Sequence, residues 1–437
     1  MSGFSLTLAL RALKNRNYKL FFGGQLVSLS GSWMQQIAMG WLVYRLTDSA
    51  FMLGLVGFAS QVPSLVLAPF AGVVIDKMNR HKILVATQSM AMMQAFLLVL
   101  LLATSTVQVW HLVVLNMMLG IVNGFDTPAR QAFVVEMIEN KEDLPNAIAL
   151  NSMMFNTARL LGPSLAGFLL AATSELVCFL INGISFVAVI IALLAMKIDH
   201  SKTVKSRKSV WEGLKEGFHY TFDFVPVRSL ILLVALVSLA GMPYVVLMPV
   251  FARDILHGGP HILGLLMGSV GTGALLGALF LAARKTILGL GKIIVYTTFT
   301  FGLMLIAFAF SRSLILSMVF LVLTGMSMMI RGASSNTIVQ TIIEDDKRGR
   351  VMSFYVMAFV GVMPFGSLLF GSLASRFGAT VTLVVGGVAC MGGAVWFALQ
   401  LPALRKVVRP IYTKLGILPE VAEGIQATSN LRVPPQN

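Results

Sequence analysis

Charged residues are scarce in this sequence. Only 12% of its 437 residues are Asp, Glu, Lys or Arg, whereas 57% are hydrophobic. Soluble domains carry about 25% charged residues, and a chain this apolar could not cover a surface that faces only water. The composition therefore excludes an ordinary soluble protein and indicates one for which lipid is part of the solvent.

Cysteine and histidine are also rare, with two and six residues. Cys178 and Cys390 each lie inside an apolar run, where a thiol usually packs as a small hydrophobe. We therefore expect no disulfide framework and no metal site. The sequence also lacks a G-x4-G-K-(S/T) phosphate loop, a cluster of catalytic residues and a filter motif. ATP-driven transport, catalysis and a channel are disfavoured, and we expect neither enzyme activity nor a cofactor.

Acidic residues are outnumbered by basic ones, 18 against 33, which gives a net charge of +15. In a soluble protein this balance would suggest a nucleic-acid partner. In membrane proteins, however, Lys and Arg gather in the cytoplasmic loops. We therefore expect no nucleic-acid partner and use the bases to assign orientation.

Long apolar runs are what the sequence has in abundance. A membrane-spanning helix needs about 20 apolar residues, and the alternating pattern of a barrel strand is missing. The sequence therefore predicts an all-α integral membrane protein with twelve transmembrane helices. The predicted spans are residues 20–44, 50–75, 83–105, 110–130, 145–172, 176–196, 229–251, 262–283, 293–311, 314–338, 351–375 and 377–402. Most bases then fall on one side of the membrane, which places both termini in the cytoplasm.

The longest connection between spans divides them six and six. The predicted parts are an N-terminal six-helix bundle (1–196), a cytoplasmic linker (197–228), a C-terminal six-helix bundle (229–404) and a cytoplasmic tail (405–437). The second part of the linker predicts an amphipathic helix on the inner membrane surface, with a partner-docking helix as the alternative. Its apolar face consists of Trp211, Leu214, Phe218, Phe222 and Val225.

The two halves of the chain repeat one another. Gly120 and Gly325 each open a segment with small and polar residues that ends in an acidic cluster. A repeat of about 205 residues, each with six spans, is typical of transporters built from two pseudo-symmetric bundles. The acidic clusters are Glu139, Glu142 and Asp143 in the first half and Glu344, Asp345 and Asp346 in the second.

A short charged stretch, GVVIDKMNRHK at residues 72–82, separates the second and third spans. It resembles the signature loop of the major facilitator superfamily, G-x3-D-(R/K)-x-G-R-(R/K)-(R/K). Asn79 replaces the last Gly and His81 replaces a base. Since Asn tolerates the left-handed turn conformation, the loop is still expected to form. The matching residues are Gly72, Asp76, Lys77, Arg80 and Lys82.

Two roles are open for this loop. Its bases could simply hold the turn at the lipid headgroups. Asp76 adds a gating hypothesis, because a carboxylate at a helix end can bind the N-terminal dipole of a facing helix or an opposing base. The resemblance implies that Asp76 meets the start of span eleven, near residues 351–354, and that Arg80 meets Asp126. Such contacts would close the inner side in one conformation and break in the other.

Within the superfamily, two segments look like the bacterial exporters of siderophores (enterobactin-type) and macrolides. These segments are LFFGGQLVSLSGSWMQQIAMGWLVYRLT (20–47) and NTARLLGPSLAGFLL (156–170). The second contains Gly162, Pro163 and Gly167, which resemble the core of a motif in span five of the superfamily's antiporters. Pro bends a helix and Gly lets a neighbour approach, so we expect either a hinge between the bundles or an ordinary kink.

Charges inside the spans need an explanation, since each costs about 2.5–3.5 kcal/mol or more at the bilayer centre. Arg159 lies near the middle of span five. It could pair with carbonyl groups or with Asn151 and Asn156, or it could meet an anionic substrate in a cavity. Polar residues of nearby spans could line the same cavity or bond to each other. The cavity candidates are Gln25, Gln35, Gln36, Asn116, Asn123, Asn156 and Arg159.

Proton coupling needs a titratable group near the cavity. Many drug antiporters of the superfamily have an acid in span one, but this sequence has none there, and Asn116 stands near the place expected for their Arg in span four. Asp126 is the candidate proton carrier. We expect Arg331, which occupies the place of Asp126 in the repeat, to form an ion pair with Glu344 or a neighbour. The inner-gate and coupling candidates are Asp126, Arg130, Glu136 and Arg331.

The sequence thus predicts a secondary-active exporter of a small amphipathic or anionic compound that works by rocker-switch alternating access. Proton antiport is a hypothesis. A lipid or metabolite transporter of the same fold is the alternative. The expected setting is the bacterial cytoplasmic (inner) membrane, and the expected partners are the small-molecule substrate, membrane lipids and protons, with a monomeric chain.

Overall fold

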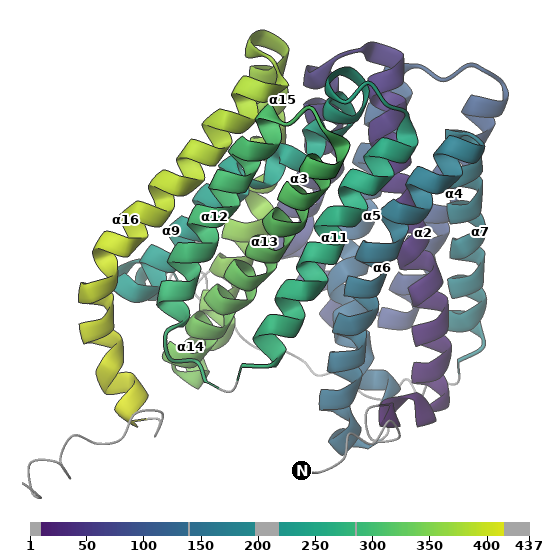
Figure 1. Cartoon of the computed structure of the whole chain (residues 1–437). Coiled ribbons are helices and arrows are strands. Elements are labelled where there is room, and N and C mark those ends of the chain that lie inside the picture. The colour runs from purple at the N-terminus through teal and green to yellow at the C-terminus, as the bar shows by residue number, and fades with distance from the viewer. Residues whose placement is uncertain (1–9, 139, 197–217, 285, 415–437) are drawn as a thin grey trace, which may run out of the picture.

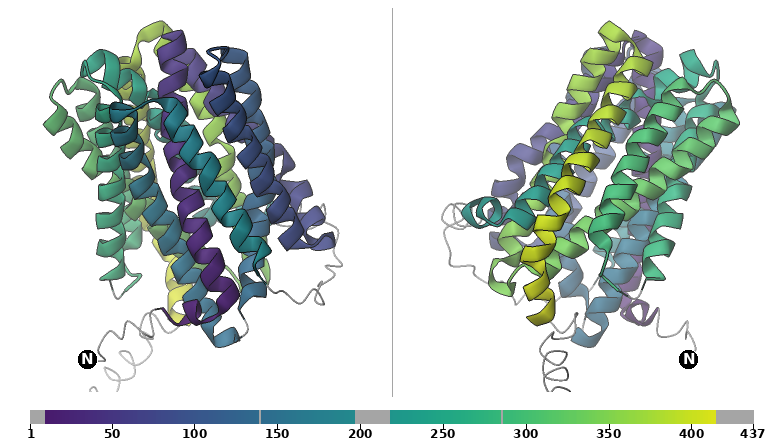
Figure 2. Two further views of the ribbon diagram at one scale, coloured as in Figure 1. Left: turned by 90° about the vertical axis from the view of Figure 1, so that its right-hand side faces the viewer. Right: turned by 60° about the vertical axis from the view of Figure 1, so that its left-hand side comes forward.

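A computed structural model describes residues 10–138, 140–196, 218–284 and 286–414 of the chain (Figure 1). Within these residues all regular elements are helical, as the apolar runs predicted. The long helices run along one common direction (Figure 2). Ten segments are long and apolar enough to cross a membrane, judged by length and composition.

The N-terminal half contains long helices that each overlap a predicted span. They are α2 (Arg16–Thr47), α3 (Ala50–Lys77), α4 (Arg80–Ala103), α5 (Val109–Phe133), α6 (Leu144–Ala172) and α7 (Glu175–Leu194). Short 3-10 helices η1 (Arg11–Lys14), η2 (Val134–Met137) and η3 (Lys141–Asp143) connect them or precede them. The ten segments above do not include α2 and α6, so the number of twelve spans stays a prediction.

The C-terminal half has two interrupted helices where the sequence predicted continuous spans. Pro243, Pro249 and Pro364 lie at these interruptions, and each lacks the amide hydrogen that a continuous helix would use. The first runs through α9 (Val225–Ala240), η4 (Met242–Leu247), α10 (Met248–Val250) and η5 (Phe251–Ile255), and the second through α14 (Asp345–Val356), η6 (Met357–Gly361) and α15 (Met363–Phe377). The uninterrupted helices are α11 (Pro260–Ala282), α12 (Leu290–Phe310), α13 (Leu314–Ile342) and α16 (Ala379–Lys414).

Helix pairing recurs in the two halves. In the first half α3 packs on α5, and α4 packs on α5 and α7. In the second half α11 packs on α13, and α12 packs on α13 and α16. The halves meet mainly where α3 packs on α15 and where α6 packs on α11. Cys178 and Cys390 are both buried and unpaired.

The two ends of the molecule differ in charge. The basic end carries the turn between α3 and α4 at Met78 and Asn79, and both limits of the described chain lie there (Figure 1). The opposite end carries the turn between α2 and α3 at Asp48 and Ser49. The basic end and the opposite end are defined by these two turns.

The linker and the tail differ in part from the prediction. Trp211 and Leu214 of the predicted amphipathic helix lie outside the described residues, but residues 218–223 are helical. The Phe218 ring lies 6.0 Å from the ring of Phe354 in α14, so this part packs on the C-terminal half. The predicted tail begins inside α16, because the helix continues through Pro402 to Lys414.

Candidate functional site

The turn between α3 and α4 is shorter than the predicted loop. α3 continues to Lys77 and α4 begins at Arg80, so Gly72 lies within α3. Asn79 is extended, with φ −66° and ψ 115°, and its side chain accepts a hydrogen bond from the Lys82 amide at 3.2 Å. The left-handed conformation expected of Asn79 is therefore wrong, because the residue caps the start of α4 instead.

The charged residues of this turn have different surroundings. Lys77 and Lys82 are exposed, which fits a place at the headgroups. The side chain of Asp76 lies outside the described part of the structure, so its gating contact stays a prediction. The helix that it was expected to face begins at Asp345, so residues 351–354 lie more than one turn inside α14.

Arg80 does not contact Asp126 as the resemblance implied. Its Nη1 atom lies 2.8 Å from Oε1 of Glu136, in an ion pair at the surface. Asp126 is buried, with 4% of its surface exposed, and its Oδ1 accepts hydrogen bonds from Thr87 at 2.9 Å and Gln88 at 2.7 Å. These donors belong to α4, so Asp126 joins α4 to α5 and is not available to Arg80.

Arg130 completes the surroundings of Asp126. It lies one turn further along α5, and its Nε lies 3.8 Å from the second carboxylate oxygen. The carboxylate therefore has two neutral donors and one cation around it.

Arg331 occupies the corresponding place in the second half, but it has no such partners. Its side chain is 1% exposed, and none of its three guanidinium nitrogens has a hydrogen-bond partner among the described residues. The expected ion pair with Glu344 is wrong, because Glu344 lies thirteen residues further on, about 20 Å along the helix axis. Glu344 instead binds Lys347 at 2.7 Å.

The surroundings of Arg331 are polar but do not satisfy it. The Tyr355 hydroxyl, which lies near the guanidinium, donates to the Gly332 carbonyl at 3.1 Å. The hydroxyl oxygens of Ser334 and Ser335, one turn further on α13, are also buried and have no hydrogen-bond partner in the described part of the chain.

Arg159 lies in the middle of α6, where side chains from both halves meet. Its guanidinium carbon lies 5.8 Å from the centre of the Trp33 ring of α2, and its Nη2 lies 3.6 Å from the sulfur of Met328 on α13. A thioether is only a weak acceptor. The Asn156 side chain lies outside the described part, and the ring of Phe155 packs edge-on against Trp33 at 5.9 Å. Arg159 thus has no carboxylate partner among the described residues.

Tyr244 in η4 belongs to the same neighbourhood. It is close enough to Arg159 to interact with its charge, it is fully buried, and its hydroxyl has no partner among the described residues. A cation, a hydroxyl without a described partner and an aromatic pair therefore gather at the centre, and they come from three segments of the chain, α2, α6 and η4.

Several predicted cavity residues lie between helices instead. The Gln35 amide nitrogen donates to Gln94 at 2.8 Å, and its carbonyl oxygen accepts from Asn182 at 2.7 Å. Asn116 donates to the Leu112 carbonyl of its own helix at 2.8 Å. Gln25 is buried as well. The prediction that Gln25, Gln35 and Asn116 line the cavity is therefore wrong, because all three lie inside the N-terminal half.

Two of the candidates are accessible. The Gln36 side chain is exposed, and it lies about one turn beyond Trp33 on α2. Asn123 on α5 is exposed as well. These two can still face a cavity.

The glycines of α6 bring helices close together. A Cβ on Gly162 would lie 2.4 Å from the Trp33 Cβ of α2, within the same half. A Cβ on Gly167 would lie 2.3 Å from the Gly264 Cα of α11, in the other half. α6 continues through Pro163 without a break. Gly167 therefore belongs to the contact between the halves, whereas Gly162 does not.

The sequence analysis missed a set of polar contacts between the halves at the opposite end. Arg253 pairs with Asp48, and the Tyr44 hydroxyl donates to Asp254. The Arg253 guanidinium also lies 5.5 Å from the centre of the Tyr44 ring. Acidic residues are rare at this end of the predicted topology. Asp48 and Asp254 could therefore have indicated these contacts, but only the basic residues were used, to assign the orientation.

Apolar contacts continue this interface toward the centre. A Cβ on Gly54 of α3 would lie 2.5 Å from the Ser367 carbonyl oxygen of α15. Further along the same pair of helices, the rings of Phe58 and Phe365 lie 5.8 Å apart. The two halves are therefore in close contact from the opposite end to the centre.

Comparison with known proteins assigns the chain to a family. The model of the transmembrane secretion effector family matches residues 7–414. The chain is 26% identical over 371 residues to the staphyloferrin A transporter of Staphylococcus aureus, covering 85% of this chain and 92% of that protein. It is 22% identical to the macrolide efflux protein A of Streptococcus pyogenes, covering 86% and 94%.

The fold is also that of a solved transporter. A bacterial homologue of the human lysosomal transporter Spinster, in an inward-facing and occupied conformation, superimposes with a TM-score of 0.69 at 14% identity, covering 89% of this chain and 97% of that one. The resemblance to siderophore and macrolide exporters is thus confirmed, and the chain is a multi-pass membrane transporter rather than an enzyme. It belongs to the transmembrane secretion effector family of the major facilitator superfamily.

Proposed function

We propose that this protein is a secondary-active exporter that moves a small amphipathic or anionic compound across the bacterial cytoplasmic membrane by alternating access. Its helices form twelve spans in two six-helix bundles, residues 1–196 and 229–404, and the basic end faces the cytoplasm. The similarity to a macrolide efflux protein supports the direction of transport. The concentration of Lys and Arg at one end supports the orientation.

One observation carries the mechanism: the ion pair between the halves lies at the opposite end. Asp48 and Arg253 join the halves there. The contact continues from that end toward the centre, where Gly54 approaches Ser367 and the rings of Phe58 and Phe365 lie 5.8 Å apart. We infer that the structure is the inward-facing state. Export then requires the Asp48–Arg253 pair to separate while the basic end closes.

Arg159 is the centre of the proposed substrate site. It has no carboxylate partner among the residues that the structure describes, and Trp33 and Phe155 form an aromatic wall beside it. An anionic group of the substrate would pair with Arg159, and an apolar or aromatic part would pack on the rings. Because Arg159 contacts Met328 of the other half, substrate that binds here would be sensed by both halves.

Proton antiport is the coupling that we propose, with Asp126 as the carrier. Asp126 is the least exposed carboxylate among the described residues. Its donors Thr87 and Gln88 belong to a different helix, so protonation would loosen α4 from α5.

Transport by the full-length protein in proteoliposomes tests this function. A panel of an anionic siderophore, a macrolide and a cationic dye would be offered under an imposed pH gradient. We expect an anionic member of the panel to be transported, and Arg159→Gln to lower its initial rate by about tenfold, since one lost charged contact is worth roughly 1.4 kcal/mol or more. Arg159→Lys should retain a larger part of the rate.

Arg312→Gln is the matched control, because Arg312 is an exposed arginine at the opposite end. Its rate should equal that of the unaltered protein. Preference for the cationic dye together with a normal rate in Arg159→Gln would contradict the assigned site.

A further inference from the structure

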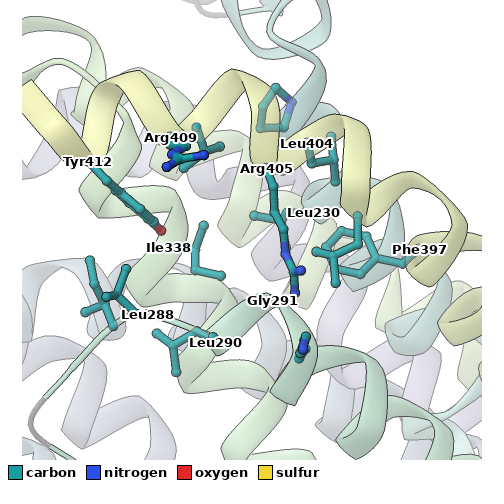
Figure 3. Close-up of a pocket in the computed structure, with 16 residues that line it drawn as sticks. Leu230, Leu288, Leu290, Gly291, Ile338, Phe397, Leu404, Arg405, Arg409 and Tyr412 are labelled. Carbon is teal, nitrogen blue, oxygen red and sulfur yellow. The ribbon is translucent and has the colours of Figure 1, made fainter. Parts of the chain in front are cut away.

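A second concave site lies away from the centre, at the basic end of the C-terminal half. It is a cavity of about 430 Å³ between the first turns of α9 and α12 and the last turns of α16 (Figure 3). This volume is within the range of about 300–1,000 Å³ that is usual for ligand pockets. The floor is apolar, with Leu230, Leu290 and Phe397 all buried.

One face of α16 changes in character along this cavity. Phe397, Leu401, Arg405 and Arg409 follow at intervals of four residues, so they share one face of the helix. Each interval is about 6 Å along the axis, and Phe397 and Arg409 are about 18 Å apart. Phe397 and Leu401 are apolar, Arg405 and Arg409 are cationic, and Tyr412 ends the series. The face is therefore apolar toward the membrane centre and cationic at the basic end.

The cations at the mouth have no anionic partner among the described residues. Lys292, Arg405 and Arg409 line the cavity and form no ion pair among the described residues. The sequence has no Asp or Glu at residues 255–343 or 347–419. Asp223, three residues before lining residue Pro226, is exposed and unpaired with these cations. Three cations that form no ion pair within the described part of the chain thus surround an apolar cavity.

We propose that this cavity binds an anionic phospholipid of the cytoplasmic leaflet. An acyl chain lies against Leu230, Phe397 and Leu401, and the phosphate meets Arg405, Arg409 and Lys292. Figure 3 shows Arg405 extending from α16 toward Gly291 at the start of α12, across the mouth of the cavity. The order of apolar and cationic groups along α16 is the order of chain and headgroup in a bilayer, so a lipid fits here in its normal orientation.

Native mass spectrometry of the full-length protein tests the proposal. The protein would be exchanged into mixed micelles with equal amounts of phosphatidylglycerol and phosphatidylcholine. We expect preferential retention of phosphatidylglycerol. The double variant Arg405→Gln/Arg409→Gln should lower the bound phosphatidylglycerol by about tenfold, because each base near a membrane surface contributes appreciably to anionic-lipid binding. Leu401→Trp, which fills the cavity without changing charge, should lower it as well.

The double variant Arg312→Gln/Arg376→Gln removes the same charge at the opposite end and should leave retention unchanged. Equal loss in the two double variants would show attraction by net charge alone and would overturn the site. Unchanged retention in Leu401→Trp would show that the headgroup binds without the cavity, and it would overturn the proposal too. Thermal unfolding of each variant in lipid-free detergent checks folding, and a loss of phosphatidylglycerol by a variant with an unchanged midpoint supports the proposal.

Discussion

Asp126 of α5 and Arg331 of α13 occupy the same place in the two halves, six residues after Gly120 and Gly325. Both side chains are buried. Asp126 has Thr87 and Gln88 as donors, whereas all three guanidinium nitrogens of Arg331 lack a partner among the described residues. The halves therefore share positions and helix pairings, but not the chemistry at those positions.

Asp126 is thus a buried charge with hydrogen-bond donors, whereas Arg331 is a buried charge without a described hydrogen-bond partner. The donors of Asp126 come from α4, so removing them or the carboxylate should weaken the contact of α4 with α5. Within the described residues, Arg331 carries the cost of a buried charge without a compensating contact. The hydroxyl groups of Ser334 and Ser335 beside it lack a described hydrogen-bond partner as well. The same position in the repeat thus stabilises the fold of the N-terminal half and destabilises that of the C-terminal half.

The largest expected effect is that of Asp126→Asn. The amide cannot carry the charge that Thr87, Gln88 and Arg130 surround, and hydrogen bonds to a charged group contribute about 1.5–3 kcal/mol. We expect the free energy of unfolding to fall by about 2 kcal/mol, measured as a lower thermal midpoint in detergent. Asp223→Asn is the control, since Asp223 is exposed. A midpoint for Asp126→Asn equal to that of the control would contradict the structural role.

An effect of opposite sign is expected for Arg331→Met. Met replaces the buried cation by a shorter, flexible apolar side chain, which removes the cost of burying a charge without a partner. We expect an unchanged or higher thermal midpoint, with a gain of about 1 kcal/mol. Arg130→Met is the matched control and should lower the midpoint, because Arg130 lies 3.8 Å from Asp126. Equal losses in the two variants would show that Arg331 has a stabilising partner.

The smallest expected effect is that of Arg80→Gln. Its pair with Glu136 is about one quarter to one third exposed, and partly exposed ion pairs contribute about 0–1 kcal/mol. The thermal midpoint should change by an amount equivalent to about 0.5 kcal/mol or less. Glu136→Gln should give the same change, and the double variant should add little to either single variant. Fully additive effects would mean that the two side chains do not interact.

Much of the fold could be predicted because the length of an apolar run can be taken from the local sequence alone. Every long helix overlaps a run that was read from the sequence alone. The limits were less accurate at α16, where the predicted span ended at residue 402 but the helix continues to Lys414. The interruptions at η4 and η6 were missed because Pro is also tolerated inside continuous membrane helices.

The site was predicted only as far as single residues allow. Arg159 is recognisable as a charge in an apolar run, but its contact with Met328 joins residues 169 positions apart. Gln35 was misplaced because the sequence does not give the rotation of α2 relative to α4 and α7. The contact of Arg253 with Asp48 depends on how the halves meet, which no single helix encodes.

The central claim is that the halves separate at one end while they meet at the other. Distances between spin labels on the same two helices, α5 and α13, test it most directly in protein with Cys178 and Cys390 replaced by Ala. One pair, at Trp110 and Ile315, reports on the opposite end, and a second pair, at Gln131 and Gln340, reports on the basic end. All four positions are exposed.

We predict a short distance at the opposite end and a long one at the basic end in protein without substrate. A pH gradient with transported substrate should lengthen the first and shorten the second. Two distances that lengthen or shorten together, or that stay fixed while transport proceeds, would contradict alternating access by these two halves.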